Sequence, residues 1–289
     1  AMRSLGCQME NTVTVSKETQ PLIVLNIPGI ENAFYQEIIR GARVSAKAHG
    51  CHLLIHESHL NKGNMLDFCN LLRRVDAAGV ILLNRISEEA LNQIRTIAPL
   101  VQCCEYNEHA DYPYVSIDDT RAAEIATEYL LSNGGSKIAL INGPGNFKYA
   151  KRRQEGFMNA LQKAEVMIPK QWIVQLPEVS YEMAYAAVCR LLNSDSRPNA
   201  FFTISDVFAA AVIRAAKRFH LHVPRDILVV GFDNIELSSM TSPSITTVNQ
   251  PKFQMGYTAC EMLLELMEDP HGEMKSLLLD TELVIREST

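Results

Sequence analysis

Two residues with opposite hydrogen-bonding roles stand out: an aspartate that ends a buried strand and an arginine on an apolar helix face. The run "DILVVGF" at 226–232 is typical of a buried strand, and Asp233 follows it directly. A helix cap explains Asp233 poorly, because at most a short helix follows before the β-rich run "SITTVNQ". Arg153, in "FKYAKRRQEGFMNALQKA", shares one helix face with Tyr149 and Phe157. An arginine among apolar residues is costly unless an acid or a polar ligand pairs with it.

Arg153 and Asp233 together suggest a site that binds a small polar molecule. An arginine donor fork and an aspartate acceptor suit neighbouring hydroxyls or a ring amide, and an aromatic side chain adds a stacking face. Phe34 and Tyr35 are candidates for that face, with ordinary core packing as the alternative. We expect Asp233 to be the partner of Arg153 across a cleft, with a purely structural ion pair as the alternative.

Signatures of catalysis and of metal binding are missing from the sequence. No GxGxxG follows the first strand, and "NGPGN" at 142–146 lacks the third glycine and the lysine of a phosphate-binding loop. There is no GxSxG, CxxC or HExxH motif, and the eight histidines lack metal-ligand spacing. Asp233 as a general base with Arg153 as electrophile would have no nucleophile beside it. We therefore expect no enzymatic activity, no cofactor and no metal.

Apolar runs that alternate with helix-period stretches predict an α/β fold. Continuous apolar strands separated by helices are typical of parallel sheets covered on both faces, and nine strands are too many for one compact sheet. We therefore expect two doubly wound parallel-sheet lobes. The predicted strands are "LIVLNI" (22–27), "HLLIHE" (52–57), "GVILLN" (79–84), "LVQCC" (100–104), "YVSID" (114–118), "KIALING" (137–143), "WIVQL" (172–176), "AFFTIS" (200–205) and "ILVVGFD" (227–233).

Polar residues follow several of these strands at their carboxyl ends, where doubly wound folds bind ligands. Besides Asp233, they are Asn26, Asn84-Arg85, Glu105, Asn142-Gly143 and Ser205-Asp206. Their positions predict a cleft between two facing lobes. Asp206 directly precedes a predicted helix, so we expect it to cap that helix, as Asp118 or Asp119 would cap the helix in "DDTRAAEIATEYLLSNGG".

Composition and charge limit the possible classes of protein. The 289 residues are 47% hydrophobic and 21% charged, which is typical of a globular chain of two lobes. A net charge of −6 and a pI near 5.8 argue against binding nucleic acid by charge alone. No apolar run approaches the roughly 18–20 residues of a membrane span, and the start lacks the apolar core of a signal peptide. Seven cysteines without framework spacing fit a reducing compartment, so we expect a cytoplasmic protein without membrane contact.

A series of motifs, in order from about residue 21 to the end, points to a known family. They are "AFYQEIIRGA", "GVILLN", "SIDD", "KIALINGP", "RRQEGF", "SDVFAAAVIRA", "VPRDILVVGFDNIELSSMTSPSITTVNQP" and "ELVIREST". Together they resemble the effector-binding core of LacI/GalR-type bacterial transcription repressors, and the long seventh motif is the most specific. The resemblance implies a type I periplasmic-binding-protein-like fold, in which three crossover segments join the two lobes around an effector.

The resemblance also implies boundaries for the lobes. The crossover segments would fall near 117–119, 246–249 and 275–277. The N-terminal lobe would consist of residues 21–117 plus 249–275, and the C-terminal lobe of residues 118–248 plus 276–289. Residues 1–20 would be the remnant of a hinge or linker, because "MRSLGCQ" at 2–8 resembles the end of the family's hinge helix.

Matching motifs imply which residues touch the effector. These are Phe34, Tyr35, Asn84 or Arg85, Glu105, Tyr149, Arg153, Ser205, Asp233 and Gln250. Many relatives place an aromatic side chain near the position of Val179; here either Tyr181 replaces it or the pocket is more open. The stretches "FYQEIIRGARVSAKAHG" and "LDTELVIREST" most resemble members that respond to a ribonucleoside such as cytidine, and a sugar is the alternative effector.

The family's N-terminal helix-turn-helix domain is absent from this sequence. The resemblance implies a homodimer that binds operator DNA only through that missing domain, so we do not expect this chain to bind operator DNA specifically. Effector binding would then alter DNA affinity through the arrangement of the lobes. An alternative from another class is a periplasmic-type solute-binding protein that delivers a sugar or nucleoside to a transporter.

Overall fold

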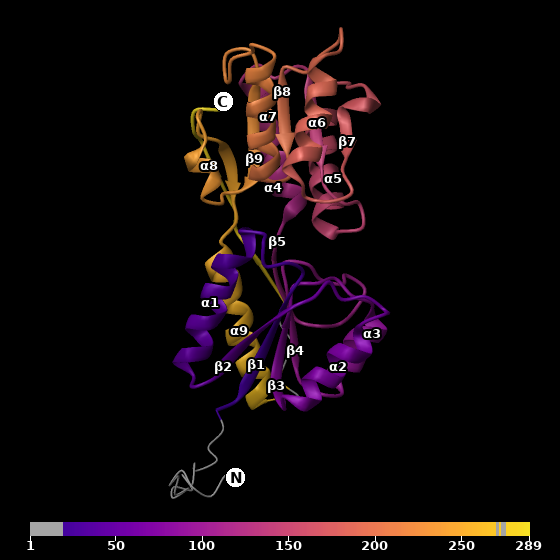
Figure 1. The fold of residues 1–289 in the computed structure, drawn as a ribbon, viewed down its shortest axis with the longest axis vertical. Helices are drawn as coiled ribbons and strands as arrows, with labels where there is room; N and C mark the ends of the chain where they lie inside the picture. Colours follow the sequence, from indigo (N-terminus) through magenta and orange to yellow (C-terminus); the bar gives the residue numbers. More distant parts are fainter. Residues whose placement is uncertain (1–19, 270–271, 273–275) are drawn as a thin grey trace, which may run out of the picture.

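The computed structural model describes residues 20–269, 272 and 276–289, and it contains two α/β lobes stacked end to end (Figure 1). Each lobe is built on a six-stranded sheet. The predicted hinge remnant at 2–8 lies outside the described residues. Among the described residues, no helix combines the length and the apolar character needed to cross a membrane.

The first lobe contains a wholly parallel sheet with the strand order β11-β5-β4-β3-β1-β2. Alternate side chains of its strands point to opposite faces, so Ile23 and Leu25 pack on one side and Val24 on the other. The strands are β1 (Leu22–Ile27), β2 (His52–Glu57), β3 (Ala77–Leu82), β4 (Leu100–Cys103), β5 (Tyr114–Ile117) and β11 (Leu277–Leu279). The helices α1 (Phe34–Ala48) and α9 (Lys252–Glu268) cover the first face, and α2 (Met65–Arg74) and α3 (Glu88–Arg95) cover the second.

The second lobe repeats this plan with the strand order β12-β10-β9-β8-β6-β7, and only β12 runs antiparallel to its neighbour. The strands are β6 (Ile138–Asn142), β7 (Ile173–Gln175), β8 (Ala200–Thr203), β9 (Leu228–Asp233), β10 (Thr246–Asn249) and β12 (Glu282–Val284). The helices are α4 (Asp119–Ser132), α5 (Lys148–Lys163), α6 (Tyr181–Leu192), α7 (Asp206–Arg218) and the short α8 (Leu237–Met240), with a 3-10 turn at Lys170–Trp172. The predicted α/β fold of two doubly wound, largely parallel sheets is confirmed.

The chain passes between the two sheets three times: from β5 to α4, from β10 to α9, and from β11 to β12. The last two passages differ from the predicted positions. Residues 246–249 form β10 in the second sheet, and the chain leaves that sheet only after Asn249. Residues 277–279 form β11, which pairs with β5 in the first sheet, whereas the predicted boundary placed them in the second lobe. The apolar runs on both sides of Asp280 look alike in the sequence, so nothing local marks the change of sheet.

Of the two helix caps predicted from the sequence, one is confirmed and one is wrong. Asp118 caps α4 by accepting a hydrogen bond from the backbone N–H of Arg121 at 2.9 Å. The exception is Asp206, which does not cap α7; the hydroxyl of Ser205 takes that position and accepts from the N–H of Phe208 at 3.3 Å. Ser205 has the extended backbone of an N-cap, and Asp206 is already the first helical residue.

Glycines allow α1 and α9 to pack backbone against backbone. A Cβ atom added at Gly41 of α1 would lie 2.0 Å from the carbonyl oxygen of Phe253 on α9. A Cβ atom added at Gly256 of α9 would lie 2.0 Å from the carbonyl oxygen of Ile38. Both distances are far below van der Waals contact, so any side chain at these positions must push the helices apart.

We therefore expect Gly41→Ala to lower the free energy of unfolding by about 1–3 kcal/mol, the usual cost of overpacking a core. Urea unfolding followed by circular dichroism measures this change. The matched control is Gly145→Ala, because Gly145 is exposed and its added Cβ atom would meet only the side chain of Gln175, at 3.6 Å. Equal stabilities of the two variants would contradict the close packing of α1 on α9.

Candidate functional site

A cavity lies between the two lobes, at the carboxyl ends of strands from both sheets. It contains about 700 Å³ of atom-free space, part of it open to solvent. Eight of the ten residues predicted to touch a ligand line it: Phe34, Tyr35, Glu105, Tyr149, Arg153, Ser205, Asp233 and Gln250. The structure therefore brings most of the predicted site residues together from both lobes.

Arg153 projects from α5 into this cavity and is 5% exposed. Its Nε donates to Oδ1 of Asp119 at 2.9 Å, and its Nη1 donates to the carbonyl oxygen of Ile204 at 2.7 Å. The predicted partner Asp233 also pairs with Arg153, but at a longer distance of 3.5 Å. The guanidinium lies 3.5 Å from the ring centroid of Phe232, so a cation–π contact and charge pairing together fix its position.

Asp119 and Lys148 belong to the same network and were not recognised as site residues in the sequence. Lys148, the first residue of α5, donates from Nζ to Oδ2 of Asp119 at 2.8 Å. Asp119 therefore holds two cations, Lys148 and Arg153. Burial alone would raise the pKa of the Asp119 carboxyl, but the two cations outweigh burial, and the pKa lies below its ordinary value. One sequence signal was present: Asp119 falls on the buried face of α4 that continues through Ala122 and Ala126.

Asp233 presents its carboxylate from a turn with an unusual backbone. Asp233 and Asn234 have φ angles of 104° and 49°, a left-handed conformation that is costly for residues other than glycine. The side chain of Gln250 donates from Nε2 to Oδ1 of Asp233 at 2.7 Å. Burial raises the pKa of Asp233 to about 6, although Arg153 and Lys252 oppose the shift. Asp233 is therefore a carboxylate at neutral pH that is easily protonated.

Glu105 reaches from the first lobe to the start of α5 in the second lobe. Its two carboxylate oxygens accept hydrogen bonds from the backbone N–H groups of Lys148 and Tyr149, each at 3.0 Å. No side chain of its own segment caps α5, so Glu105 replaces that cap from across the cavity. Burial raises the pKa of Glu105 despite these contacts. One turn further along α5, Arg152 forms an ion pair with Glu108 of the first lobe, which strengthens the tie between the lobes.

Aromatic rings line the cavity on both sides. Phe34 and Tyr35, at the start of α1, contact each other edge to face with ring centroids 5.4 Å apart. Tyr149 contributes a third ring from α5, 5.1 Å from the guanidinium of Arg153. Burial raises the pKa values of Tyr35 and Tyr149. Both hydroxyls therefore stay protonated at neutral pH, and both rings can donate a hydrogen bond as well as stack.

Asn84 and Arg85 do not line the cavity, contrary to the prediction. β3 ends at Leu82, earlier than the predicted strand, and the chain then turns away. Asn84 is buried, donates from Nδ2 to Oδ1 of Asn26 at 2.5 Å, and lies beside Nδ1 of His59 at 3.0 Å. Arg85 is partly buried beside a separate surface groove near the start of α3. Asn84 therefore holds neighbouring loops together in this structure.

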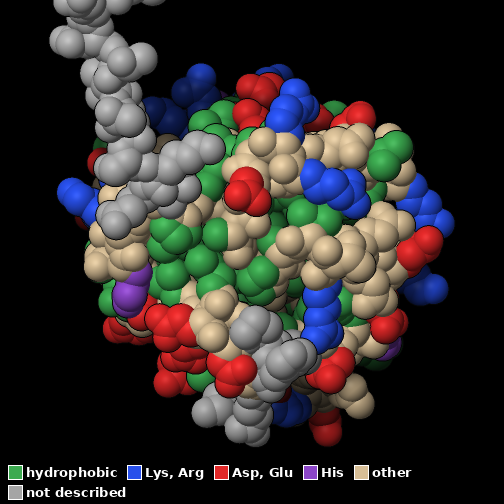
Figure 2. All heavy atoms as spheres, turned by 90° about the horizontal axis from the view of Figure 1, so that it is seen from below, with side chains coloured by type: hydrophobic (Ala, Val, Ile, Leu, Met, Phe, Trp, Pro, Cys, Tyr) green, Lys and Arg blue, Asp and Glu red, His purple; other side chains and the backbone are tan. Residues whose placement is uncertain are grey.

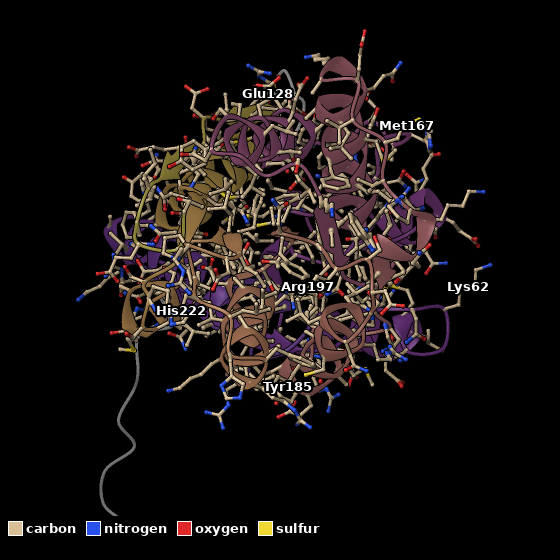
Figure 3. The ribbon with its side chains drawn as sticks, turned by 90° about the horizontal axis from the view of Figure 1, so that it is seen from above. Lys62, Glu128, Met167, Tyr185, Arg197 and His222 are labelled. Carbon is tan, nitrogen blue, oxygen red and sulfur yellow. The ribbon has the colours of Figure 1, made fainter. Side chains whose placement is uncertain are left out.

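Val179 lines the cavity and Tyr181 does not, which favours the more open of the two predicted pockets. The ring of Tyr181 instead stacks on that of Tyr185, with the centroids 6.4 Å apart. In the view from above, Tyr185 lies at the outer edge of the second lobe (Figure 3), where its hydroxyl accepts a hydrogen bond from Arg218. The aliphatic side chain of Val179 therefore lines this part of the cavity, and Tyr181 does not replace it with an aromatic ring.

Asp206 forms a second buried acidic position behind Asp233. Its carboxyl accepts from the hydroxyl of Thr247 at 2.6 Å and from the N–H of Ile235 at 2.8 Å. Burial and the nearby charge of Asp233 raise the pKa of Asp206 to about 8. Asp206 therefore supports the strand ends around the Asp233 turn rather than the start of a helix. Within the described part of the chain, no group of three or more His, Cys, Asp or Glu side chains is arranged to hold a metal ion.

Comparisons with known proteins agree with this architecture. The model of the periplasmic binding protein-like domain matches residues 127–289. The chain is 33% identical over 277 residues to the HTH-type transcriptional repressor CytR of Escherichia coli (strain K12), across 95% of this chain and 81% of that protein. A solved structure of an uncharacterized protein from Actinobacillus succinogenes matches with a TM-score of 0.86 at 32% identity, across 93% and 99% of the two chains. The structure of a LacI family transcriptional regulator from Enterococcus faecium with bound ribose matches with a TM-score of 0.82 at 25% identity, across 93% and 98%.

Proposed function

The chain belongs to the LacI family of bacterial transcriptional regulators, and from this premise we propose that it binds a small neutral polar effector in the interlobe cavity. The effector alters operator binding by a homodimer of the full-length protein, whose DNA-binding domain precedes this core. On this proposal the protein acts in the cytoplasm and catalyses no reaction. The relatives are named as repressors and regulators, which supports a regulatory role over a transport role.

The observation that carries the proposal is the combination of Arg153, Asp233 and the aromatic rings in one cavity. A guanidinium donor, a carboxylate acceptor and two protonated tyrosine hydroxyls can bind adjacent hydroxyls, while a ring offers a stacking face. A ribonucleoside such as cytidine presents both a planar base and adjacent ribose hydroxyls. The resemblance of two stretches to family members that respond to a ribonucleoside, together with the 33% identity to the repressor CytR, supports this choice. The ribose bound to the Enterococcus faecium regulator supports the second candidate, a sugar.

The charges of the cavity favour an uncharged effector over a phosphorylated one. Lys148 and Arg153 are both paired with Asp119. Asp233 adds a further carboxylate to the lining, and Glu105 adds another. A phosphate group would have to compete with these carboxylates for two cations that are already neutralised. The cavity therefore suits hydroxyl and amide groups better than a phosphate.

The contacts across the cavity suggest how an effector acts. Glu105 at the start of α5 and the Arg152–Glu108 ion pair connect the two lobes. An effector that contacts Arg153 from one lobe and Tyr35 from the other adds to this closure. Only a ligand that binds two lobe arrangements with different affinities can shift the balance between them. On this proposal, a change in lobe closure alters the spacing of the hinge segments in the dimer.

At the free end of the first lobe, seen from below, hydrophobic side chains gather near the centre of the visible surface, and both acidic and basic side chains lie around them (Figure 2). With a net charge of −6, we expect the chain to give no salt-sensitive, sequence-specific gel shift with operator DNA.

We also expect sedimentation to report a dimer; a monomer would favour the alternative of a transporter-associated solute-binding protein.

Titration calorimetry tests the proposed effector directly. Cytidine is the first ligand, with uridine, adenosine and ribose as comparators and cytidine monophosphate as the charged control. Tight binding of cytidine, with weak binding of the phosphate, would support a nucleoside-responsive regulator. Binding of ribose or another sugar alone would favour the second candidate, and absence of binding to every compound would overturn the nucleoside proposal.

Effector affinity should fall in mild acid because Asp233 must accept hydrogen bonds as a carboxylate. Its pKa of about 6 lies above the ordinary value, so protonation begins close to neutral pH. Hydrogen-bond donors on the effector stabilise the charged form of Asp233. At pH values below 6 the free carboxyl group carries a proton, and binding of the effector must release that proton. We expect a loss approaching tenfold per pH unit below about pH 6, relative to the affinity at pH 7. Asp233→Asn should flatten this part of the profile, and a slope unchanged in that variant would assign the effect to another acid such as Glu105.

A further inference from the structure

Lys252 occupies an unusual position between the lobes. It is the first residue of α9, a helix of the first lobe, yet it is only 6% exposed and its ammonium group contacts the second lobe. Nζ donates to the backbone carbonyl of Asp233, to that of Asn234 at 3.2 Å, and to that of Gln250 at 3.4 Å. One buried cation therefore gathers three carbonyls from the end of β9 and from the crossover after β10.

These carbonyls belong to the turn that places Asp233 in the cavity. Asp233 and Asn234 have left-handed backbones, and such residues cost of order 1–3 kcal/mol each unless their surroundings hold them in place. Burial lowers the pKa of Lys252, and the charges of Asp233 and Asp206 oppose this shift. A buried ammonium group is tolerated because its three donors find three carbonyl acceptors.

We infer that Lys252 is a positioning residue, which fixes the 233–234 turn so that the Asp233 carboxylate faces the effector and which ties this turn to α9 of the first lobe. The inference rests on the proposed function of the cavity as an effector site. Lys252 itself does not line the cavity. It acts on the ligand through Asp233, and contacts made by a ligand with Asp233 are passed to the first lobe through Lys252.

Replacement by an uncharged side chain of similar length tests this role. We expect Lys252→Met to weaken cytidine binding at least tenfold, measured by titration calorimetry, and Lys252→Arg to restore most of the affinity because it keeps the charge and the donors. The matched control is Lys217→Met, at an exposed position on α7, which should leave the affinity within twofold of the parent chain. Equal affinities of the Lys252→Met and Lys217→Met variants would overturn the inference.

A double-mutant cycle separates positioning from a general loss of structure. If Lys252 acts through Asp233, Lys252→Met should change the affinity less than twofold in a chain that already carries Asp233→Asn. The same loss in both backgrounds would show that Lys252 acts elsewhere.

A second measurement needs no ligand and so distinguishes this inference from the choice of effector. Carboxyl-selective NMR titration should give a higher pKa for Asp233 in Lys252→Met than in the parent chain, because the nearby ammonium group lowers that value. An unchanged pKa would overturn the inference even if cytidine binds. A raised pKa in a chain that binds none of the tested nucleosides or sugars would support the role of Lys252 and count against the proposed effector.

Discussion

Arg153→Ala should weaken effector binding by about 2–5 kcal/mol, because the ligand loses a charged donor in a buried site. This corresponds to a loss of roughly thirtyfold to several thousandfold in affinity. The expected size is large because Arg153 sits between Asp119, Asp233 and the ring of Phe232. Without the Arg153 guanidinium, the carboxylates of Asp119 and Asp233 lose a cationic partner and repel the acceptor groups of a ligand. Titration calorimetry with cytidine, or with whichever ligand binds the parent chain, measures the change.

Two variants make the Arg153 prediction specific. Arg153→Lys keeps the charge but not the planar fork, so we expect an intermediate affinity. Arg190→Ala removes an arginine from the exposed face of α6 and should leave the affinity unchanged. Thermal unfolding of each variant must show a folded chain at the titration temperature. Unaltered affinity in folded Arg153→Ala would mean that Arg153 serves only the structural ion pair.

Asp119→Ala should cause the largest loss of stability among single changes near the cavity. It leaves both Lys148 and Arg153 buried without their main anionic partner, and removal of one member of a buried ion pair costs about 3–5 kcal/mol. The low pKa of Asp119 means that its charge stabilises the fold above the ordinary pKa and that this contribution is lost as the pH falls through the folded value. Denaturant unfolding at neutral pH measures the loss.

The neighbouring aspartate provides a matched control. Asp118→Ala removes only the cap of α4, which contributes about 1 kcal/mol in typical helices. A larger loss for Asp119→Ala than for Asp118→Ala therefore separates the buried network from the cap. Lys148→Met should reduce the cost of the Asp119 change, because one of the two unpaired cations is then absent. Equal losses for the two aspartate variants would contradict the network.

Local patterns in the sequence were sufficient to predict the fold. Continuous apolar runs indicated the parallel strands, and β1 and β2 have the predicted bounds. The buried positions of Arg153 and Phe157 on α5 also follow from helical periodicity. The end of β3 and the sheet assignment of β11 could not be predicted, because pairing with a distant strand decides both.

Part of the site could also be predicted from local sequence patterns. Asp233 follows an apolar strand and Arg153 interrupts an apolar helix face, so each looks anomalous in its own segment. Asp119 looks ordinary, because an acid at a helix start is normally a cap, and its partners lie about thirty residues further along the chain. Asn84 does not line the cavity, and the sequence could not show this, because a polar residue after a strand looks the same whether it faces a ligand or a neighbouring loop.

The route of the chain between the sheets has a consequence for the order in which a ribosome produces the protein. α9 covers α1 and the face of the first sheet, and β11 completes that sheet, but in the sequence both lie after every strand and helix of the second lobe except β12. During translation the second lobe therefore emerges almost complete while the side of α1 that packs against α9 has no cover. Chains interrupted at this stage expose surface prone to aggregation, and chaperones that hold nascent chains would act on the first lobe rather than the second.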